Sequence, residues 1–234
     1  MIASQPCCGS TRTSTKSQSL EAVIPQSEIG PLYDKISRFY DIWGKLTESR
    51  AAKRAVDLAG IQDGLHILEV AVGTGLVFQE IVRRNPNGQN TGIDLSEGML
   101  AKARRRLSKS LLAGYTLTQG TAKALDLEDS CIDLLINNYM FDLISFQEMA
   151  AVLNEFHRVL KPGGKLVLVN MTLGRTFGSR VYDRFYSRFP RLLGGCRGVQ
   201  LTEILERNRF RVDTREYIQQ CLFPSEVIVS HKSK

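Results

Sequence analysis

The sequence lacks the features that mark membrane-spanning and secreted proteins. No apolar run approaches ~18 residues, the length that a helix needs to cross a bilayer. The first residues contain no long apolar core of a secretory signal, and no acid precedes Glu21. We therefore expect a cytoplasmic protein whose membrane contact, where it has one, is peripheral.

The sequence also lacks the cysteine spacing of a zinc or redox site. No two cysteines form a CxxC pair, and an odd number without a signal peptide favours reduced thiols. We predict no metal site, and the role of the adjacent pair near the N-terminus stays open. The five cysteines are Cys7, Cys8, Cys131, Cys196 and Cys221.

Two nucleotide-binding motifs are incomplete in the glycine-rich stretch LEVAVGTGL, residues 68–76. A dinucleotide fingerprint needs a third glycine, but Leu76, Val77 and Phe78 follow Gly75. A P-loop needs Lys-Ser or Lys-Thr after its glycines, and neither follows here. Sites for NAD and for ATP are therefore disfavoured.

Basic residues exceed acidic ones. The chain has 31 Lys and Arg against 24 Asp and Glu, a formal net charge of +7. The excess favours acidic partners, which include anionic lipid, an anionic substrate or nucleic acid. Two stretches concentrate it, KARRR at 102–106 and an arginine-rich stretch at 175–197.

The hydrophobic pattern predicts one α/β domain after a disordered tail over residues 1–28. Strands alternate with helices, which indicates a Rossmann-like, doubly wound and mostly parallel sheet with a C-terminal antiparallel strand pair. Helical spacing is expected over 29–60, 76–84, 98–111 and 145–160, the last ended by Pro162-Gly163-Gly164, and strands over 65–72, 90–95, 115–120, 130–140, 165–172, 210–220 and 223–232.

The glycine turn after the first strand indicates a nucleoside-binding site. Gly73 and Gly75 allow backbone conformations that other residues avoid and let a ligand approach the main chain. Asp94 follows at the end of the second strand, where a ribose-binding carboxylate belongs. A glycine turn and a ribose-binding carboxylate, without a phosphate-binding motif, fit a nucleoside.

Four stretches then resemble class I S-adenosylmethionine-dependent methyltransferases. They are ILEVAVGTG, GIDLSEGMLAKAR, GTAKALDLEDSCIDLLINN and LNEFHRVLKPGGKLVLVN, in this order. With the lead-in YDKISRFYD they look most like the methyltransferases of ubiquinone and menaquinone biosynthesis, although the C-terminal third resembles these less and Ala71 replaces the family's first glycine. The resemblance implies a single methyltransferase domain over 29–234, with a helical insertion around 175–195.

The resemblance also implies a cofactor, S-adenosyl-L-methionine, and the residues that hold it. Glu69 and the Gly73-Thr74-Gly75 turn would line the methionine part and the ribose, and Asp94 would hold the ribose hydroxyls. The remaining cofactor residues, against the adenine or facing the substrate, would be Leu95, Met99, Thr121, Ala122 and Asn138.

No strong general base is evident for the methyl transfer. His157 is interpreted as a helix-surface residue, His66 opens a strand at its amino end, and His231 is terminal. Tyr139 and Asp142, after the fourth strand, are the catalytic candidates. For the acceptor we predict contacts with Tyr33, Tyr40, Tyr139 and Phe185, since aromatic rings suit a sulfonium and an apolar substrate.

The stretch 175–195 reads as an amphipathic helix with aromatic and arginine faces. A substrate lid, an anchor on an anionic membrane, a dimer helix and ordinary packing all fit it. We expect methyl transfer to a small or lipophilic acceptor such as a quinone precursor. The alternatives are a nucleic-acid methyltransferase, disfavoured because NNYM replaces an NPPY-type motif, and a non-catalytic cofactor-binding scaffold. The acceptor atom and the oligomeric state stay open.

Overall fold

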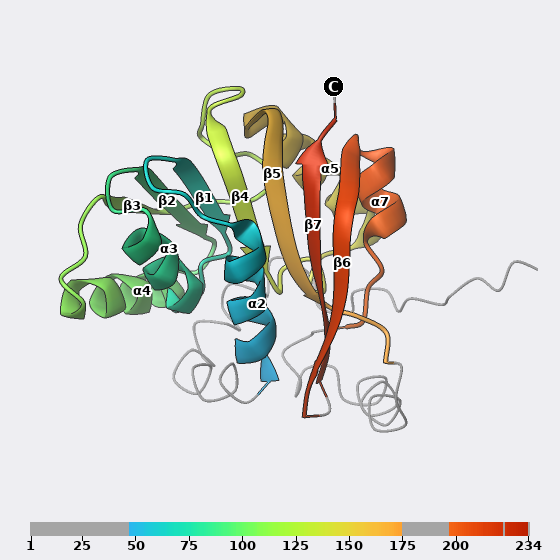
Figure 1. Cartoon of the computed structure of the whole chain (residues 1–234), viewed down its shortest axis with the longest axis horizontal. Helices are drawn as coiled ribbons and strands as arrows, with labels where there is room; N and C mark the ends of the chain where they lie inside the picture. The colour runs from blue at the N-terminus through green and yellow to red at the C-terminus, as the bar shows by residue number, and fades with distance from the viewer. Residues whose placement is uncertain (1–46, 175–196, 222, 234) are drawn as a thin grey trace, which may run out of the picture.

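The computed structural model describes residues 47–174, 197–221 and 223–233, which form one sheet with helices on both sides (Figure 1). The predicted tail over 1–28 and the helical insertion around 175–195 lie outside the described residues. In chain order the elements are α2 (Ser49–Ala59), β1 (His66–Val70), α3 (Leu76–Arg84), β2 (Gln89–Asp94), α4 (Glu97–Lys109), β3 (Tyr115–Gln119), β4 (Ile132–Asn138), α5 (Phe146–Val159), β5 (Leu160–Met171), α7 (Thr202–Arg207), β6 (Phe210–Gln220) and β7 (Phe223–Lys232).

The sheet has seven strands in the order β3-β2-β1-β4-β5-β7-β6. The five strands from β3 to β5 pair in parallel, and β7 pairs antiparallel with both β5 and β6. The strand order reverses between β1 and β4, so their carboxyl ends flank a switch point where ligands bind in such sheets. The predicted fold class is confirmed, including the antiparallel C-terminal pair.

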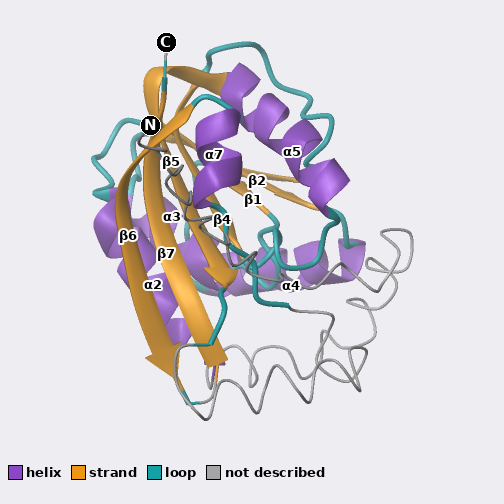
Figure 2. Ribbon diagram, turned by 90° about the vertical axis from the view of Figure 1, so that its right-hand side faces the viewer, coloured by secondary structure: helices purple, strands orange, loops and turns teal. Residues whose placement is uncertain are grey.

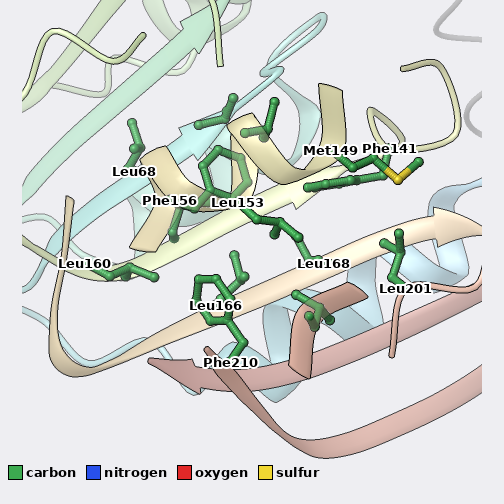
Figure 3. Packing of buried hydrophobic residues seen from close by; sticks show 14 of the residues in the cluster. Leu68, Phe141, Met149, Leu153, Phe156, Leu160, Leu166, Leu168, Leu201 and Phe210 are labelled. Atoms are coloured by element: carbon green, nitrogen blue, oxygen red, sulfur yellow. The ribbon is translucent and has the colours of Figure 1, made fainter. Parts of the chain in front are cut away.

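Two apolar cores cover the two faces of the sheet. One side packs against α2, α3 and α4, and the other packs against α5 and α7, as the edge-on view shows (Figure 2). Phe156 of α5 lies among leucines of β1 and β5 on the second side (Figure 3). Because both faces are covered, the central strands β1, β4 and β5 contain short apolar runs.

Local signals fix where two helices begin. The Ser96 side chain accepts a hydrogen bond from the Met99 backbone N–H at 3.1 Å and caps α4. Ser145 and Glu148 form a reciprocal capping box at the start of α5. The cap on α4 fixes the path of the chain where it leaves β2.

The end of α5 differs from the expectation in two ways. The helix ends at Val159, before the Pro-Gly-Gly sequence, and β5 already begins at Leu160. The register with β4 shifts between Ile132 and Leu134, which accommodates the Pro-Gly-Gly residues as a bulge.

His157 is buried at 8% exposure against the Phe210 ring, so its interpretation as a surface residue was wrong. The hydrophobic pattern missed this because α7 and β6 cover that side of α5.

Two further observations concern the described residues. None of their helices is long and apolar enough to cross a bilayer. Of their cysteines, Cys131 is a free thiol, and within the described part of the chain no cluster of side chains could hold a metal ion.

Candidate functional site

The chain leaves β1 through a turn built on left-handed backbone conformations. Ala71, Gly73 and Gly75 have φ values of 61°, 57° and 79°. This region costs a residue with a side chain about 1–2 kcal/mol, so Ala71 stores strain where glycine would not. The Val72 N–H donates to the Ile93 carbonyl at 3.2 Å, which fixes the turn against the end of β2.

The two glycines of this turn serve different ends. A Cβ on Gly75 would lie 2.9 Å from the Ala103 Cβ, so this glycine lets α3 approach α4 closely. A Cβ on Gly73 would meet nothing within 4 Å, because Gly73 borders open space. Gly73 is therefore the glycine placed to face a ligand.

Asp94 at the end of β2 joins three segments of the chain. Its carboxylate accepts hydrogen bonds from the Gly73 N–H at 2.7 Å and the Ser96 N–H at 2.9 Å. Its backbone carbonyl accepts from the Gly120 N–H at 3.0 Å, after β3. A carboxylate offers about four lone pairs, so Asp94 can accept hydrogen bonds from more than two donors.

Glu69 is a buried carboxylate beside this turn. It is 1% exposed, and its Oε1 accepts a hydrogen bond from Asn138 Nδ2 at 3.2 Å. Its Oε2 has no hydrogen-bond partner among the described residues. Burial raises the pKa of Glu69 well above its ordinary value, the Asn138 hydrogen bond opposes this rise, and the charge of Asp94 adds to it. A cationic donor at Oε2 would remove the cost of this burial.

Two cavities open at the carboxyl ends of the strands. The first, which we name the β2–β3 cavity, reaches from the glycine turn past Asp94 to the residues after β3. The second, the α2–α3 cavity, lies between those two helices and has a volume of about 430 Å³. Both are lined by Ala71, Gly73, Asn138 and Tyr139, so they meet at the ends of β1 and β4.

Most of the predicted cofactor residues line these cavities. Leu95 is 41% exposed, an unusual state for a leucine, while Met99 beneath it is buried. Glu69 and Thr74 line the α2–α3 cavity, and Gly75 lines neither cavity. The predicted residues of the β2–β3 cavity are Gly73, Asp94, Leu95, Met99, Thr121, Ala122 and Asn138.

The two catalytic candidates lie in different surroundings. Tyr139 has a φ of 52° and is 5% exposed, and its hydroxyl is 2.7 Å from the Ser225 Oγ of β7. Asp142 is fully buried and lines neither cavity, and its carbonyl oxygen accepts from the buried Arg197 guanidinium at 2.9 Å. Tyr33, Tyr40 and Phe185 lie outside the described residues.

Sequence reasoning missed several residues of the site. Ser225 comes from an antiparallel strand far along the chain, and no local pattern pairs it with Tyr139. Ala52, Lys53 and Val56 of α2 line the α2–α3 cavity. The helical spacing of α2 predicts a packed face, but only the tertiary structure turns part of that face toward the glycine turn.

The chain is similar to known methyltransferases in sequence. Residues 67–164 match the family model described as a methyltransferase domain. The chain is 31% identical over 172 residues to the ubiquinone/menaquinone biosynthesis C-methyltransferase of Geobacter sulfurreducens, an alignment that covers 72% of this chain and 65% of that protein. It is 34% identical over 171 residues to the demethylmenaquinone methyltransferase of Thermus thermophilus, covering 72% of this chain and 74% of that protein.

Solved structures share the fold at low identity. The crystal structure of the [4+2]-cyclase SpnF superposes with a TM-score of 0.71 at 19% identity, covering 92% of this chain and 99% of that one. A geranyl diphosphate methyltransferase in complex with SAM superposes with a TM-score of 0.64 at 15% identity, covering 79% and 85% of the two chains. Since these two proteins carry different names for their activities, the shared fold by itself does not give the reaction.

Proposed function

The chain belongs to the class I S-adenosylmethionine-dependent methyltransferases, and from this premise we propose that it methylates a small lipophilic acceptor of the quinone-precursor type. The names of both relatives support a quinone-type acceptor. The observation that carries the proposal is that the two cavities meet at Asn138 and Tyr139. A cofactor and an acceptor bound in adjoining cavities could therefore contact each other there.

The groups at the glycine turn fit this cofactor. A carboxylate at Asp94 suits the two ribose hydroxyls because it accepts several hydrogen bonds, and the backbone N–H groups of Gly73 and Ser96 hold it in place. The open Oε2 of Glu69 suits the ammonium group of the methionine part. The exposed Leu95 offers an apolar platform for adenine.

The junction of the cavities is where methyl transfer would be aligned. When bound, S-adenosylmethionine supplies an electrophilic methyl group on a sulfonium. Asn138 is held by Glu69, and the Tyr139 N–H donates to the Val169 carbonyl at 2.7 Å, so the end of β4 is rigid. Fixed orientation of two reactants can supply about 7–11 kcal/mol of the barrier reduction, and this rigid end would provide it.

The α2–α3 cavity suits an apolar acceptor. The side chains that line it include Ala52, Val56, Val72, Leu76 and Val77. A cavity of about 430 Å³ is within the size range of small-molecule sites and exceeds what a methionine side chain alone would fill. We place the reacting ring of the acceptor beside Tyr139 and its apolar part along this wall.

Tyr139 remains the proposed catalytic residue, and the other candidate, Asp142, is proposed as a positioning residue. Tyr139 lines both cavities and can contact an acceptor directly. Asp142 is buried away from both and would act through its neighbours. The predicted acceptor contacts of Tyr33, Tyr40 and Phe185 also remain part of the proposal.

Transfer of a labelled methyl group tests the function. The full chain is incubated with methyl-labelled S-adenosylmethionine and, in separate reactions, reduced demethylmenaquinone, a phospholipid mixture and transfer RNA. We expect label in the quinone fraction, and Asp94→Asn should reduce it at least tenfold. Asp126→Asn, which changes an exposed carboxylate outside both cavities, should leave it unchanged.

The other results are equally informative. Label in the transfer RNA or in the phospholipid would replace the proposed acceptor by a member of that class. Tight cofactor binding without label in any fraction, including a total cell lipid extract, would favour the non-catalytic scaffold.

A further inference from the structure

One face of α4 gathers positive charge around a shallow hollow. We name the α4 basic face for Lys102, Arg105, Arg106 and Lys109, which recur at spacings of three and four and therefore share one side of the helix. Together with Gln79 and Ser110 they line a single hollow, and none of these six described residues is a carboxylate. Each of the six can donate hydrogen bonds, which suits an anionic oxygen-rich group.

The helix has little acid to offset this charge. Its thirteen residues include five cations and one acid, Glu97. Glu97 pairs with Arg104, which is not part of the α4 basic face. Arg105 and Lys109 are exposed. Figure 1 shows α4 along the lower left margin, at the opposite end of the sheet from α7.

An exposed leucine follows this face directly. Leu111 is 92% exposed and has a φ of 54°. The Leu111 N–H donates to the Ser108 carbonyl at 3.2 Å and the Leu112 N–H to the Leu107 carbonyl at 3.4 Å, the two bonds of a Schellman helix end. Glycine or asparagine suits the position of Leu111 best, yet the chain places there a large apolar side chain that packs on almost nothing.

We propose that the α4 basic face and Leu111 dock on an anionic lipid surface. The hollow would take the phosphate of a lipid headgroup, and Leu111 would enter the boundary of the acyl chains. The positive charge alone would suit nucleic acid equally well. However, proteins that bind single-stranded nucleic acid usually stack its bases on aromatic side chains, and no aromatic residue is among the described residues that line this hollow. The exposed leucine beside the cations is the feature that a lipid surface uses.

No residue of the α4 basic face lines either cavity, although Arg106 Nε donates to the Thr74 carbonyl of the glycine turn at 2.8 Å. The inference therefore does not depend on the proposed acceptor. It puts a peripheral membrane contact on described residues, whereas the sequence indicated such a contact only as one of several uses of the stretch 175–195.

Sedimentation with vesicles tests the proposal. The full chain is mixed with vesicles of pure phosphatidylcholine and with vesicles that contain phosphatidylglycerol, at low and high salt. We expect binding to the anionic vesicles alone, weakened by salt. The double variant Arg105→Gln with Lys109→Gln should bind roughly 25-fold more weakly, about fivefold per cation.

A charge-matched control separates this face from net charge. Arg207 of α7 and Arg211 of β6 have side chains that are 77% and 74% exposed. Replacing both by glutamine removes the same charge at the opposite edge of the sheet and should leave vesicle binding nearly unchanged. Equal losses in the two double variants would mean that only net charge matters, and would overturn the proposal.

Leu111→Asn tests the apolar part without harming the fold. Asparagine tolerates the left-handed conformation, so the melting temperature should not fall, while vesicle binding should weaken roughly tenfold. Unchanged vesicle binding in this variant and in the α4 double variant would sink the proposal, as would wild-type protein that ignores anionic vesicles. Binding to duplex DNA that needs Arg105 and Lys109, without vesicle binding, would assign the face to nucleic acid instead.

Discussion

Glu69 holds a carboxylate where water is almost excluded, and its proposed contact with the cofactor leads us to expect pH-sensitive binding. Burial raises its pKa in the cofactor-free protein, so at low pH the group is neutral and attracts an ammonium weakly. We expect the affinity for S-adenosylmethionine to fall as the pH drops through this raised pKa. Calorimetric titrations across the acid range should record the loss, and Glu69→Gln should bind weakly with a flat pH profile.

The same pKa shift affects stability with the opposite sign. Because the folded pKa lies above the unfolded one, the contribution of Glu69 to the free energy of unfolding of the cofactor-free protein is highest below the unfolded pKa and is lost as the pH rises through the folded pKa. Glu69→Gln should remove this dependence in thermal melts. Glu128→Gln, at an exposed position outside both cavities, should retain it, and a wild-type profile in Glu69→Gln would contradict the assignment.

Asp94 should contribute to both affinity and stability. Replacing it by alanine removes the proposed ribose contacts, where hydrogen bonds to a charged group contribute about 1.5–3 kcal/mol each. Affinity for the cofactor should therefore fall at least tenfold. The change also removes the partner of the Gly73 and Ser96 N–H groups, which should lower the free energy of unfolding by about 1–3 kcal/mol.

Calorimetry and chemical denaturation measure these two effects of Asp94 separately. Asp94→Asn keeps a carbonyl oxygen as an acceptor, so it should recover part of the stability but little of the affinity. Unchanged affinity in Asp94→Ala would remove the ribose role from this residue.

At the scale of elements, one glycine of the turn allows helix packing and the other faces the proposed ligand. Gly75→Ala places a methyl group 2.9 Å from the Ala103 Cβ, where α3 meets α4, so overpacking should add about 1–3 kcal/mol to the cost of the left-handed conformation. Gly73→Ala meets no atom within 4 Å and should cost only the conformational part, about 1–2 kcal/mol.

Affinity should rank these two glycine variants in the reverse order. The methyl group of Gly73→Ala projects into the open space where the cofactor is proposed to bind, so binding should fall further there than in Gly75→Ala. Denaturant melts and calorimetry on both proteins provide the comparison. Equal stabilities would mean that α4 moves aside to accommodate the methyl group.

At the scale of the molecule, the site joins the ends of several strands, so a ligand there should stabilise the whole fold. A ligand that binds only the native state adds about 2.7 kcal/mol at a hundred times its Kd. S-adenosylhomocysteine should therefore raise the melting temperature, while NAD and ATP, for which the turn lacks the full motifs, should not. A larger rise with NAD would overturn the interpretation of the turn as a nucleoside site.

The strands and the cofactor end of the site follow from local patterns. Buried parallel strands read as short apolar runs, and the observed β1, β3 and β4 lie inside their predicted ranges, while β6 and β7 match theirs. Asp94 and the glycines lie at strand ends, where the parallel topology gathers them at one edge. Thus a pattern within single segments, with one rule of topology, was enough to bring Gly73 and Asp94 together, while Asn138 was predicted from the family resemblance.

What the sequence by itself determined is the fold class and a nucleoside-binding turn, because both depend on short-range order: apolar periodicity, glycines and one acid at a fixed distance along the chain. The cofactor itself followed from the resemblance of four motifs to a known family. The tertiary structure alone decided which glycine faces open space and that His157 is buried. It also joined Tyr139 to Ser225 and exposed Leu111 beside the α4 basic face. These properties depend on contacts between residues that are distant in the chain, and hydrophobic periodicity carries no record of which distant segment covers a given face.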